Sequence, residues 1–170
     1  MQSQKLAFGI LLLVVFVFIG CNSTAKLDAN KEVIHRFTKA INNQEWVSLD
    51  DFVLPNFVRH SDATVGPQVK SLGDFKNLQL EFLKSMPDQK ITIEKLVAEG
   101  DYVAALATYS GTQSGPMPPF PPSGKRVESK FISIFRLEEG KIAELWVEWD
   151  NLAMMQQLGY FPLPEQGEEQ

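Results

Sequence analysis

The spacing of apolar residues changes from a helical to a strand-like period near Pro87, and this change constrains the fold more than any other feature. Upstream, apolar residues recur every three or four positions, as on the buried face of a helix. Downstream, four segments alternate apolar and polar residues, as half-buried strands do: residues 90–98, 102–113, 126–136 and 141–150. Helices followed by consecutive strands predict an α+β domain, with N-terminal helices packed on a curved antiparallel sheet.

Short turn sequences join two pairs of these strands. The segments "EGD" at 99–101 and "EEGK" at 138–141 are typical of tight turns, so each predicts a β-hairpin. The third connection, "SGPMPPFPPSGK" at 114–125, is longer and rich in proline. We find no internal repeat and no boundary with a second domain.

Three helices are predicted in the first half of the chain. The first begins at Asp28 or Asn30, and the second covers residues 45–53. A turn-rich segment at 56–68 follows and is predicted to be a loop. The third helix begins after Ser71, which forms a capping-box pattern with the acid three residues later.

The N-terminus resembles a bacterial lipoprotein signal peptide. Lys5 precedes the apolar run "LAFGILLLVVFVFI" at 6–19, and Gly20 and Cys21, the only cysteine, follow it. The run is short for a membrane span. Acyl chains on Cys21 would anchor the protein, since each buried methylene contributes about 0.8 kcal/mol. The alternatives are a cleaved secretory peptide with a chance cysteine and an uncleaved anchor. All three place the domain outside the cytoplasm, and the lipoprotein interpretation places it in the bacterial cell envelope, facing the periplasm or the cell surface.

The rest of the chain is long enough for one domain with a real core. Removal of residues 1–20 from the 170-residue chain would leave a polar tether at 21–29, a folded domain at 30–161 and an acidic disordered tail at 162–170. The net charge of −5 would become −6, because the removed segment contains one lysine and no acid. We do not expect so acidic a protein to bind nucleic acid.

Four motifs carry a resemblance to a known family: "EGDYVAALATYSGTQSG", "PPSGK", "FRLEEGKIAELW" and "WDNLAMMQQLG". Together they are similar to the SnoaL-like polyketide cyclase or ester cyclase group, from roughly Lys31 to Phe161. The resemblance implies an NTF2-like, cone-shaped α+β barrel. Family cyclases close a ring by intramolecular aldol condensation without metal or cofactor. The resemblance also implies that Asp150 is the general acid/base and that His60, which ends "FVRH", lies at the same cavity.

Two features depart from the family pattern. Many members have "GTH" where this chain has "GTQ", so Gln113 replaces an imidazole that could titrate. Members with proven cyclase chemistry are cytoplasmic enzymes, whereas this chain is predicted to be anchored outside the cytoplasm. The fold is therefore implied more strongly than the reaction.

Asp150 admits two interpretations. Trp146, Glu148 and Asp150 have the same parity on the last predicted strand, so they project from one face. Burial among tryptophans beside a like charge would raise the pKa of the Asp150 carboxyl toward working pH, as general acid/base chemistry requires. Alternatively, Asp150 is only the N-cap of a helix predicted at 151–158, because aspartate is preferred there.

The opposite parity of this strand is more apolar, since it carries Ala143, Leu145, Val147 and Trp149. An ordinary half-buried sheet would turn that face inward and leave Asp150 in water. A cone-shaped domain can instead line an inner cavity with polar groups. Both orientations therefore remain open.

Other candidates also have two interpretations each. His60 is either a surface loop residue or a proton partner at the mouth of the cavity. A metal site built from His60, Glu148 and Asp150 has no supporting ligand spacing, and we expect neither metal nor cofactor. The proline-rich segment is either a flap, whose Met117 and Phe120 cover an apolar ligand, or a rigid connection.

Two functions are consistent with these features. The first is a lipid-anchored cyclase or isomerase acting on a small carbonyl or ester compound, with Asp150 as general acid/base and His60 assisting. The second is a binding module that holds a small hydrophobic ligand without reaction. A purely structural dimerising domain would have its cavity filled by its own side chains, and whether the chain forms a homodimer is left open. The predicted substrate-binding residues are Trp146, Gln113, Glu148, Tyr109, Phe131 and Phe120.

Overall fold

The computed structural model describes residues 24–62 and 68–161. The predicted signal segment, Cys21 and the acidic tail lie outside the described residues. Five strands are found in the described part of the chain: β1 (Val53–His60), β2 (Lys90–Glu99), β3 (Tyr102–Thr112), β4 (Arg126–Glu138) and β5 (Lys141–Trp149).

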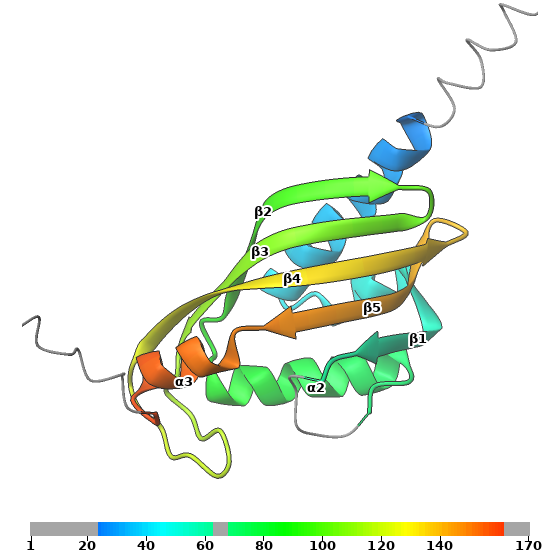
Figure 1. Cartoon of the computed structure of the whole chain (residues 1–170). Helices are drawn as coiled ribbons and strands as arrows, with labels where there is room; N and C mark the ends of the chain where they lie inside the picture. Colours follow the sequence, from blue (N-terminus) through cyan, green and yellow to red (C-terminus); the bar gives the residue numbers. More distant parts are fainter. Residues whose placement is uncertain (1–23, 63–67, 162–170) are drawn as a thin grey trace, which may run out of the picture.

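The strands form one sheet in the order β1-β5-β4-β3-β2 (Figure 1). The four predicted strands pair in antiparallel fashion, and both predicted hairpins are present. In the turn between β4 and β5, Glu139 and Gly140 have φ angles of 53° and 76°, as a type I′ turn requires. β1 pairs with β5 in parallel, so the sheet is mixed rather than purely antiparallel.

β1 corrects the prediction of a loop at 56–68. Its pairing with β5 begins at Val53 and, after an irregularity, resumes at residues 58–60. Pro55 lies in the irregular part of this edge strand, where its missing N–H removes no bond from the ladder. The proline and the polar residues around it conceal the strand in the sequence.

The first helix begins earlier than predicted and is described over residues 24–42. Residues 24–29, expected to form a tether, are therefore helical, although they are largely exposed. Burial begins at Asn30, whose side chain donates a hydrogen bond to the Gly100 carbonyl at 3.2 Å. The second predicted helix is shorter, a 3₁₀ helix η1 (Trp46–Asp51), because β1 follows it closely.

The other two helices begin where the sequence predicts. At the start of α2 (Leu72–Ser85), Ser71 Oγ accepts a hydrogen bond from the Asp74 N–H at 3.0 Å. α3 (Asn151–Leu158) ends at Gly159, whose φ of 83° is the left-handed conformation that favours glycine. No helix within residues 24–62 and 68–161 has the length and apolarity needed to cross a membrane.

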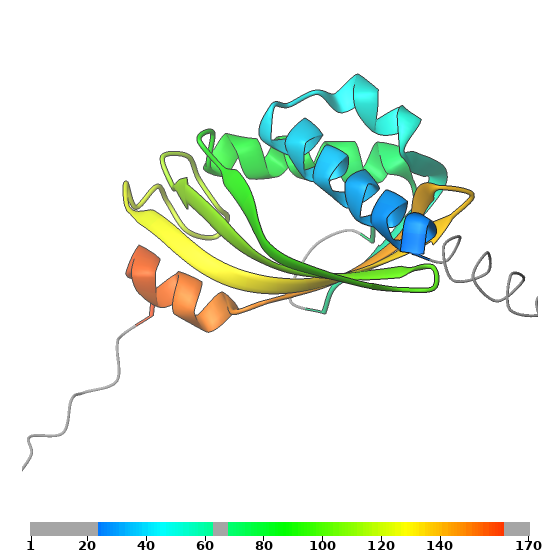
Figure 2. The same cartoon turned by 90° about the horizontal axis from the view of Figure 1, so that it is seen from above.

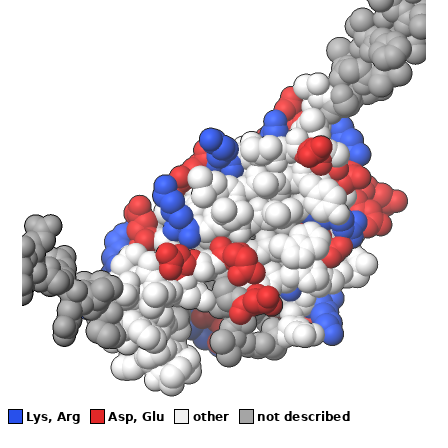
Figure 3. Space-filling view, viewed as in Figure 1, with Lys and Arg blue, Asp and Glu red and all other residues white. Residues whose placement is uncertain are grey.

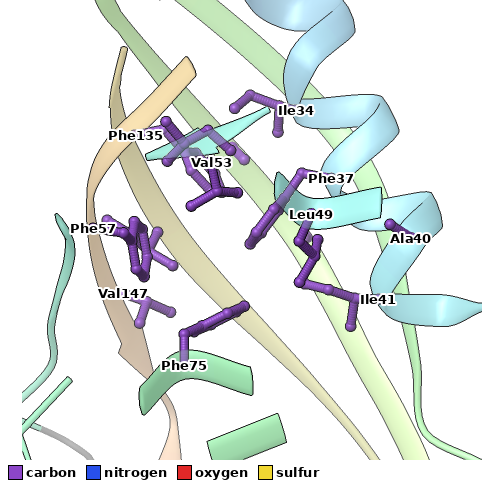
Figure 4. Packing of buried hydrophobic residues seen from close by; sticks show 14 of the residues in the cluster. Ile34, Phe37, Ala40, Ile41, Leu49, Val53, Phe57, Phe75, Phe135 and Val147 are labelled. Atoms are coloured by element: carbon purple, nitrogen blue, oxygen red, sulfur yellow. The ribbon is translucent and has the colours of Figure 1, made fainter. Parts of the chain in front are cut away.

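The helix at 24–42 and α2 cover the concave face of the curved sheet (Figure 2). Aromatic side chains from both layers meet in the core (Figure 4). The Phe37 ring lies 5.6 Å from that of Phe75 and 5.7 Å from that of Phe135, centroid to centroid. This arrangement confirms the predicted α+β domain, with helices packed on one face of a curved sheet.

The convex face of the sheet carries apolar residues as well. Ile132 and Ile134 of β4 are 57% and 43% exposed, and Val97 of β2 is also exposed. Figure 3 shows this face as a largely uncharged centre with charged residues around it. We call it the outer face, in contrast to the inner face that meets the helices.

Candidate functional site

An apolar cavity lies between the inner face of the sheet and the helices. Its volume is about 60 Å³, enough for a few water molecules and below the 300–1,000 Å³ typical of pockets for drug-sized ligands. Its walls are mainly aromatic and aliphatic, with side chains from both layers: Phe37, Phe75 and Phe82 from the helices, and Phe135, Leu145 and Val147 from the sheet. The interior is therefore not packed solid.

Five of the described residues that line the cavity carry polar side chains: Thr38, Arg59, Gln79, Tyr109 and Ser133. Gln79 and Ser133 are almost completely buried. No aspartate or glutamate occurs among these described lining residues. An apolar hollow with a few fixed polar groups is the usual composition of a small-molecule site.

Tyr109 and Phe131, both predicted as substrate-binding residues, line this cavity. The Tyr109 hydroxyl donates a hydrogen bond to Gln89 Oε1 at 2.9 Å. Burial raises the pKa of Tyr109 above its ordinary value, so the hydroxyl is neutral at physiological pH. The Phe131 ring stacks on Trp149, with centroids 4.3 Å apart and planes inclined by 19°. These aromatic side chains form one wall of the cavity.

Arg59 is the one cationic residue among the described lining residues, and it was not predicted from the sequence. Side chains alternate along β1, so Phe57 and Arg59 point inward while His60 points outward. Burial lowers the pKa of Arg59 to about 10, although the negative charge of Glu148 acts in the opposite direction. The guanidinium is therefore still protonated at neutral pH. Only recognition of "NFVRH" as a strand would have shown that Arg59 faces inward.

Asp150 does not face the cavity. β5 turns its more apolar parity inward, so Trp146, Glu148 and Asp150 project from the outer face. Asp150 is exposed, and its carboxylate accepts a hydrogen bond from the Ala153 N–H at 2.9 Å, which makes it the N-cap of α3. The expected burial of Asp150 among tryptophans is wrong. Burial of the apolar residues Ala143, Leu145 and Val147 against the helices stabilises the fold more than burial of the opposite face of the strand would. Its catalytic role stays a prediction.

A shallow hollow opens on the outer face beside Asp150. We call it the outer hollow; it is lined by Leu106, Lys130, Phe131, Ile132, Glu148, Trp149 and Asp150. Phe131 and Trp149 line both this hollow and the interior cavity. The stacked pair is therefore a wall between Asp150 and the interior.

His60 also lies on the outer face, contrary to its expected place at the cavity. Its ring stacks on Trp146, with centroids 4.8 Å apart. Its Nε2 lies 3.0 Å from Glu144 Oε2, and Arg136 Nε donates to Glu144 Oε1 at 2.7 Å. These hydrogen bonds, that of His60 first, hold the pKa of Glu144 below its ordinary value. No three His, Cys, Asp or Glu side chains in the described part of the chain come together as a metal-ligand set.

Gln113 is fully buried but binds the proline-rich segment rather than the cavity. Its Nε2 donates to the carbonyls of Gly115 and Pro121, at 3.2 Å and 3.1 Å. Its Oε1 accepts from the Ser123 N–H at 3.1 Å and from the Tyr160 hydroxyl at 2.6 Å. All four hydrogen-bonding positions of the Gln113 amide are thus used, three by the proline-rich segment and one by Tyr160, which follows α3.

Phe120 and Met117 also lie outside the cavity lining. The Phe120 ring stacks on Tyr160 with centroids 4.3 Å apart, and Met117 packs against the core. The backbones of Met117 and Phe120 exchange hydrogen bonds at 3.0 Å and 2.8 Å. These contacts support the interpretation of the segment as a rigid connection.

A family model described as SnoaL-like polyketide cyclase matches residues 31–158, which is most of the chain. The protein therefore belongs to the SnoaL-like polyketide cyclase family, and its α+β fold is the NTF2-like fold of that family. The match confirms the resemblance seen in the sequence motifs. The chain matched no curated protein in sequence.

Solved structures of similar fold come from several bacteria. The chain is similar to IdmH from Streptomyces antibioticus, which is proposed to be a polyketide cyclase, with a TM-score of 0.70 and 26% identity over 76% of this chain and 98% of that one. TsrD from Streptomyces laurentii gives a TM-score of 0.70 and 28% identity over 79% and 97%. AclR from Streptomyces galilaeus, proposed to be a hydroxylase, gives 0.70 and 25% over 82% and 87%. Because similar chains carry different proposed reactions, membership fixes the fold and not the reaction.

Proposed function

We propose that this SnoaL-like protein binds a small, largely apolar molecule with a carbonyl group in its interior cavity. The observation that carries the proposal is the cavity lining, which combines apolar walls with a few buried polar side chains. Membership in the SnoaL-like polyketide cyclase family, whose members bind small-molecule substrates, supports the proposal. A volume of about 60 Å³ restricts the cavity in this conformation to small compounds, so a larger ligand requires the walls to separate.

Nuclear magnetic resonance of the ¹⁵N-labelled protein tests this proposal. Titration with butanone and cyclohexanone should shift the amide signals of cavity residues saturably. Ala107→Leu fills the cavity from β3 and should abolish these shifts. The control is Ala104→Leu, which adds the same side chain on the outer face of the same strand and should leave binding intact. Absence of saturable shifts for both ketones, or equal binding by the two variants, would contradict the proposal.

A second candidate function is the cyclase or isomerase reaction that the sequence suggested, with Asp150 as general acid/base. The observation that favours it is the place of Asp150 beside the Phe131–Trp149 wall, which also lines the cavity. The Asp150 carboxylate would take a proton from the carbon alpha to a carbonyl. The electron pair released would attack the acceptor carbonyl, and the carboxylic acid would return the proton to the alkoxide oxygen. A substrate would need to lie in the outer hollow, or the wall would need to open.

The variant Asp150→Asn separates this reaction from the capping role. Asparagine caps a helix as well as aspartate, but it cannot accept and return a proton. Deuterium exchange at the alpha carbon of cyclohexanone in D₂O is the probe reaction. We expect exchange above the buffer rate with the original protein and at the buffer rate with Asp150→Asn. Equal exchange with both proteins, or none above buffer, would reject the reaction for simple ketones and leave the binding proposal in place.

We also propose that acyl chains on Cys21 hold the protein at the bacterial cell envelope. The apolar run at 6–19 and the cysteine that follows it support this proposal. Mass spectrometry of protein made in a bacterium that processes lipoproteins should show a diacylglyceryl-modified Cys21 at the mature N-terminus. Cys21→Ser should lose the modification and leave the membrane fraction. An unmodified Cys21 in a cleaved, fully water-soluble chain would overturn the proposal.

A homodimer is the assembly we propose for the outer face, where Val97, Ile132 and Ile134 are exposed. Exposed apolar patches often mark protein contacts. Analytical ultracentrifugation should give twice the monomer mass, and Ile134→Glu should give the monomer. A monomer at all protein concentrations would exclude this assembly.

A further inference from the structure

Three polar side chains of the interior cavity have no hydrogen-bond partner in the described part of the chain: Thr38, Gln79 and Ser133. The other two polar lining residues are engaged, since the Tyr109 hydroxyl donates to a neighbouring glutamine and Arg59 interacts with other groups of the protein. The exposed fractions of the three residues are 9%, 7% and 2%. Buried polar groups destabilise the folded state unless a guest molecule or an ordered water binds them. The cavity is therefore suited to a guest with polar atoms.

Two of these side chains enter the cavity beside the same aromatic cluster. Gln79 lies one helical turn after Phe75 in α2, and Ser133 lies two residues before Phe135 on the inner face of β4. The Phe37 ring lies between 5.6 Å and 5.7 Å from both phenylalanine rings, centroid to centroid (Figure 4). The amide of Gln79 and the hydroxyl of Ser133 therefore reach the cavity from its two opposite layers.

The volume of the cavity limits the size of a guest. A water-sized position takes about 10–15 Å³. The cavity of about 60 Å³ therefore offers about four such positions. A guest that the present walls enclose is thus a compound of a few non-hydrogen atoms, and its polar group is a large part of it.

We propose that Gln79 binds a small carboxamide in this cavity, with Ser133 donating a further hydrogen bond to the carbonyl oxygen of the guest. A carboxamide carries an acceptor oxygen and N–H donors side by side, as Gln79 does, so the two amides can exchange two parallel hydrogen bonds. A ketone accepts from the Gln79 N–H but leaves Gln79 Oε1 unpaired, and an unpaired buried acceptor costs binding free energy. The inference rests on the proposed function of the cavity and names its ligand class.

The test compares three compounds of the same size and branched shape: acetamide, acetone and propan-2-ol. Each is titrated into the ¹⁵N-labelled protein at pH 7, and the amide shifts of cavity residues are followed. We expect acetamide to bind at least about fivefold more tightly than acetone, because it adds one hydrogen bond at a buried acceptor. Propan-2-ol should bind as weakly as acetone, because its single oxygen atom cannot pair with both polar atoms of the Gln79 amide.

Substitution of Gln79 locates the preference. Gln79→Met keeps the length of the side chain and removes the amide, so acetamide should bind no more tightly than acetone. It should also raise the melting temperature of the protein without ligand, because an unpaired buried polar group is lost. Ser133→Ala should weaken the binding of acetamide and acetone alike, since both place a carbonyl oxygen there. The control Asn77→Met removes an exposed amide from the same helix and should leave the preference unchanged.

The outcomes separate this inference from the proposed function. Acetone or propan-2-ol binding as tightly as acetamide would overturn the carboxamide as ligand class and leave the cavity as a site for ketones. A preference for acetamide that survives in Gln79→Met, or a lower melting temperature of that variant, would also overturn it. Absence of acetamide binding, with butanone and cyclohexanone still bound, would overturn this inference alone, since ordered water would then satisfy the Gln79 amide. Failure of all five compounds to bind would overturn both proposals.

Discussion

The Trp149 ring stacks on the Phe131 ring with their centroids 4.3 Å apart, and this pair alone belongs to both hollows described in residues 24–62 and 68–161. The Tyr109 ring meets Trp149 edge-on at 5.4 Å and supports the pair from inside. Asp150 follows Trp149 directly in the chain and lies on the solvent side. Movement of one indole ring would therefore connect the interior with the surroundings of this carboxylate.

Removal of the Trp149 ring should open the interior. Trp149→Ala is expected to lower the free energy of unfolding by about 3 kcal/mol, because a large and partly buried side chain is lost. The enlarged apolar cavity should then bind benzene, as dry cavities do. The control Trp146→Ala removes an indole from the outer face of the same strand and should not create a benzene site. Benzene binding is measured by nuclear magnetic resonance, and equal binding by both variants would refute this view of the wall.

Loss of the Gln113 amide should destabilise the whole domain. Gln113→Ala removes four hydrogen bonds from a fully buried position, each contributing about 1 kcal/mol. We expect the free energy of unfolding in urea to fall by at least about 3 kcal/mol. Gln157→Ala is the matched control, since Gln157 is exposed and bonds only the backbone of Glu128 in the described contacts. A small and equal loss in both variants would show that the proline-rich segment does not depend on Gln113.

Gly115 should not tolerate a methyl group. A Cβ atom there would lie 1.8 Å from the Lys84 carbonyl oxygen, and the Gly115 N–H already donates to the Ser85 carbonyl at 3.0 Å. Gly115→Ala is therefore expected to cost about 2 kcal/mol of stability, the usual effect of overpacking. Gly73→Ala, in the first turn of α2 with no atom nearer than 3.6 Å, should raise stability by up to about 1 kcal/mol. If both substitutions change the melting temperature in the same direction, the close contact between the proline-rich segment and α2 is contradicted.

The Glu144 carboxylate should make the free energy of unfolding depend on pH in the acid range. Its pKa is lowered from the ordinary 4.5 by hydrogen bonds from His60 and then Arg136. A carboxyl group whose pKa falls on folding stabilises the folded state above its unfolded pKa, and this contribution is lost as the pH falls. The difference in unfolding free energy between the original protein and Glu144→Gln should therefore be full at pH 6 and shrink below about pH 4.5. A difference that stays constant between pH 6 and pH 3 would rule out this linkage.

Short patterns in the sequence were sufficient to predict most of the helices and strands of the fold. Ser71 and Asp74 define the start of α2, and Gly140 defines one hairpin, because caps and tight turns depend on a few adjacent residues. β1 was missed because its partner β5 lies more than 80 residues away and because Pro55 interrupts its pattern. An edge strand that pairs in parallel leaves little trace in local periodicity.

The candidate site was only partly predictable. Tyr109 and Phe131 were recognised, since they stand at inward positions of clearly alternating strands. Parity showed that Trp146 and Asp150 share a face, but parity alone does not decide which face is inside. Arg59 was missed because its segment was interpreted as a loop.

The pairing of β1 with β5 has a consequence for synthesis of the chain. Arg59 is made early, yet the strand that holds it in place, through the register partner Leu145, emerges from the ribosome among the last described residues. Until then the first strand has no neighbour in the sheet order. A fragment that stops before Lys141 lacks the pairing of β1 with β5 altogether, so the arginine reaches its place in the wall only after β5 has been made.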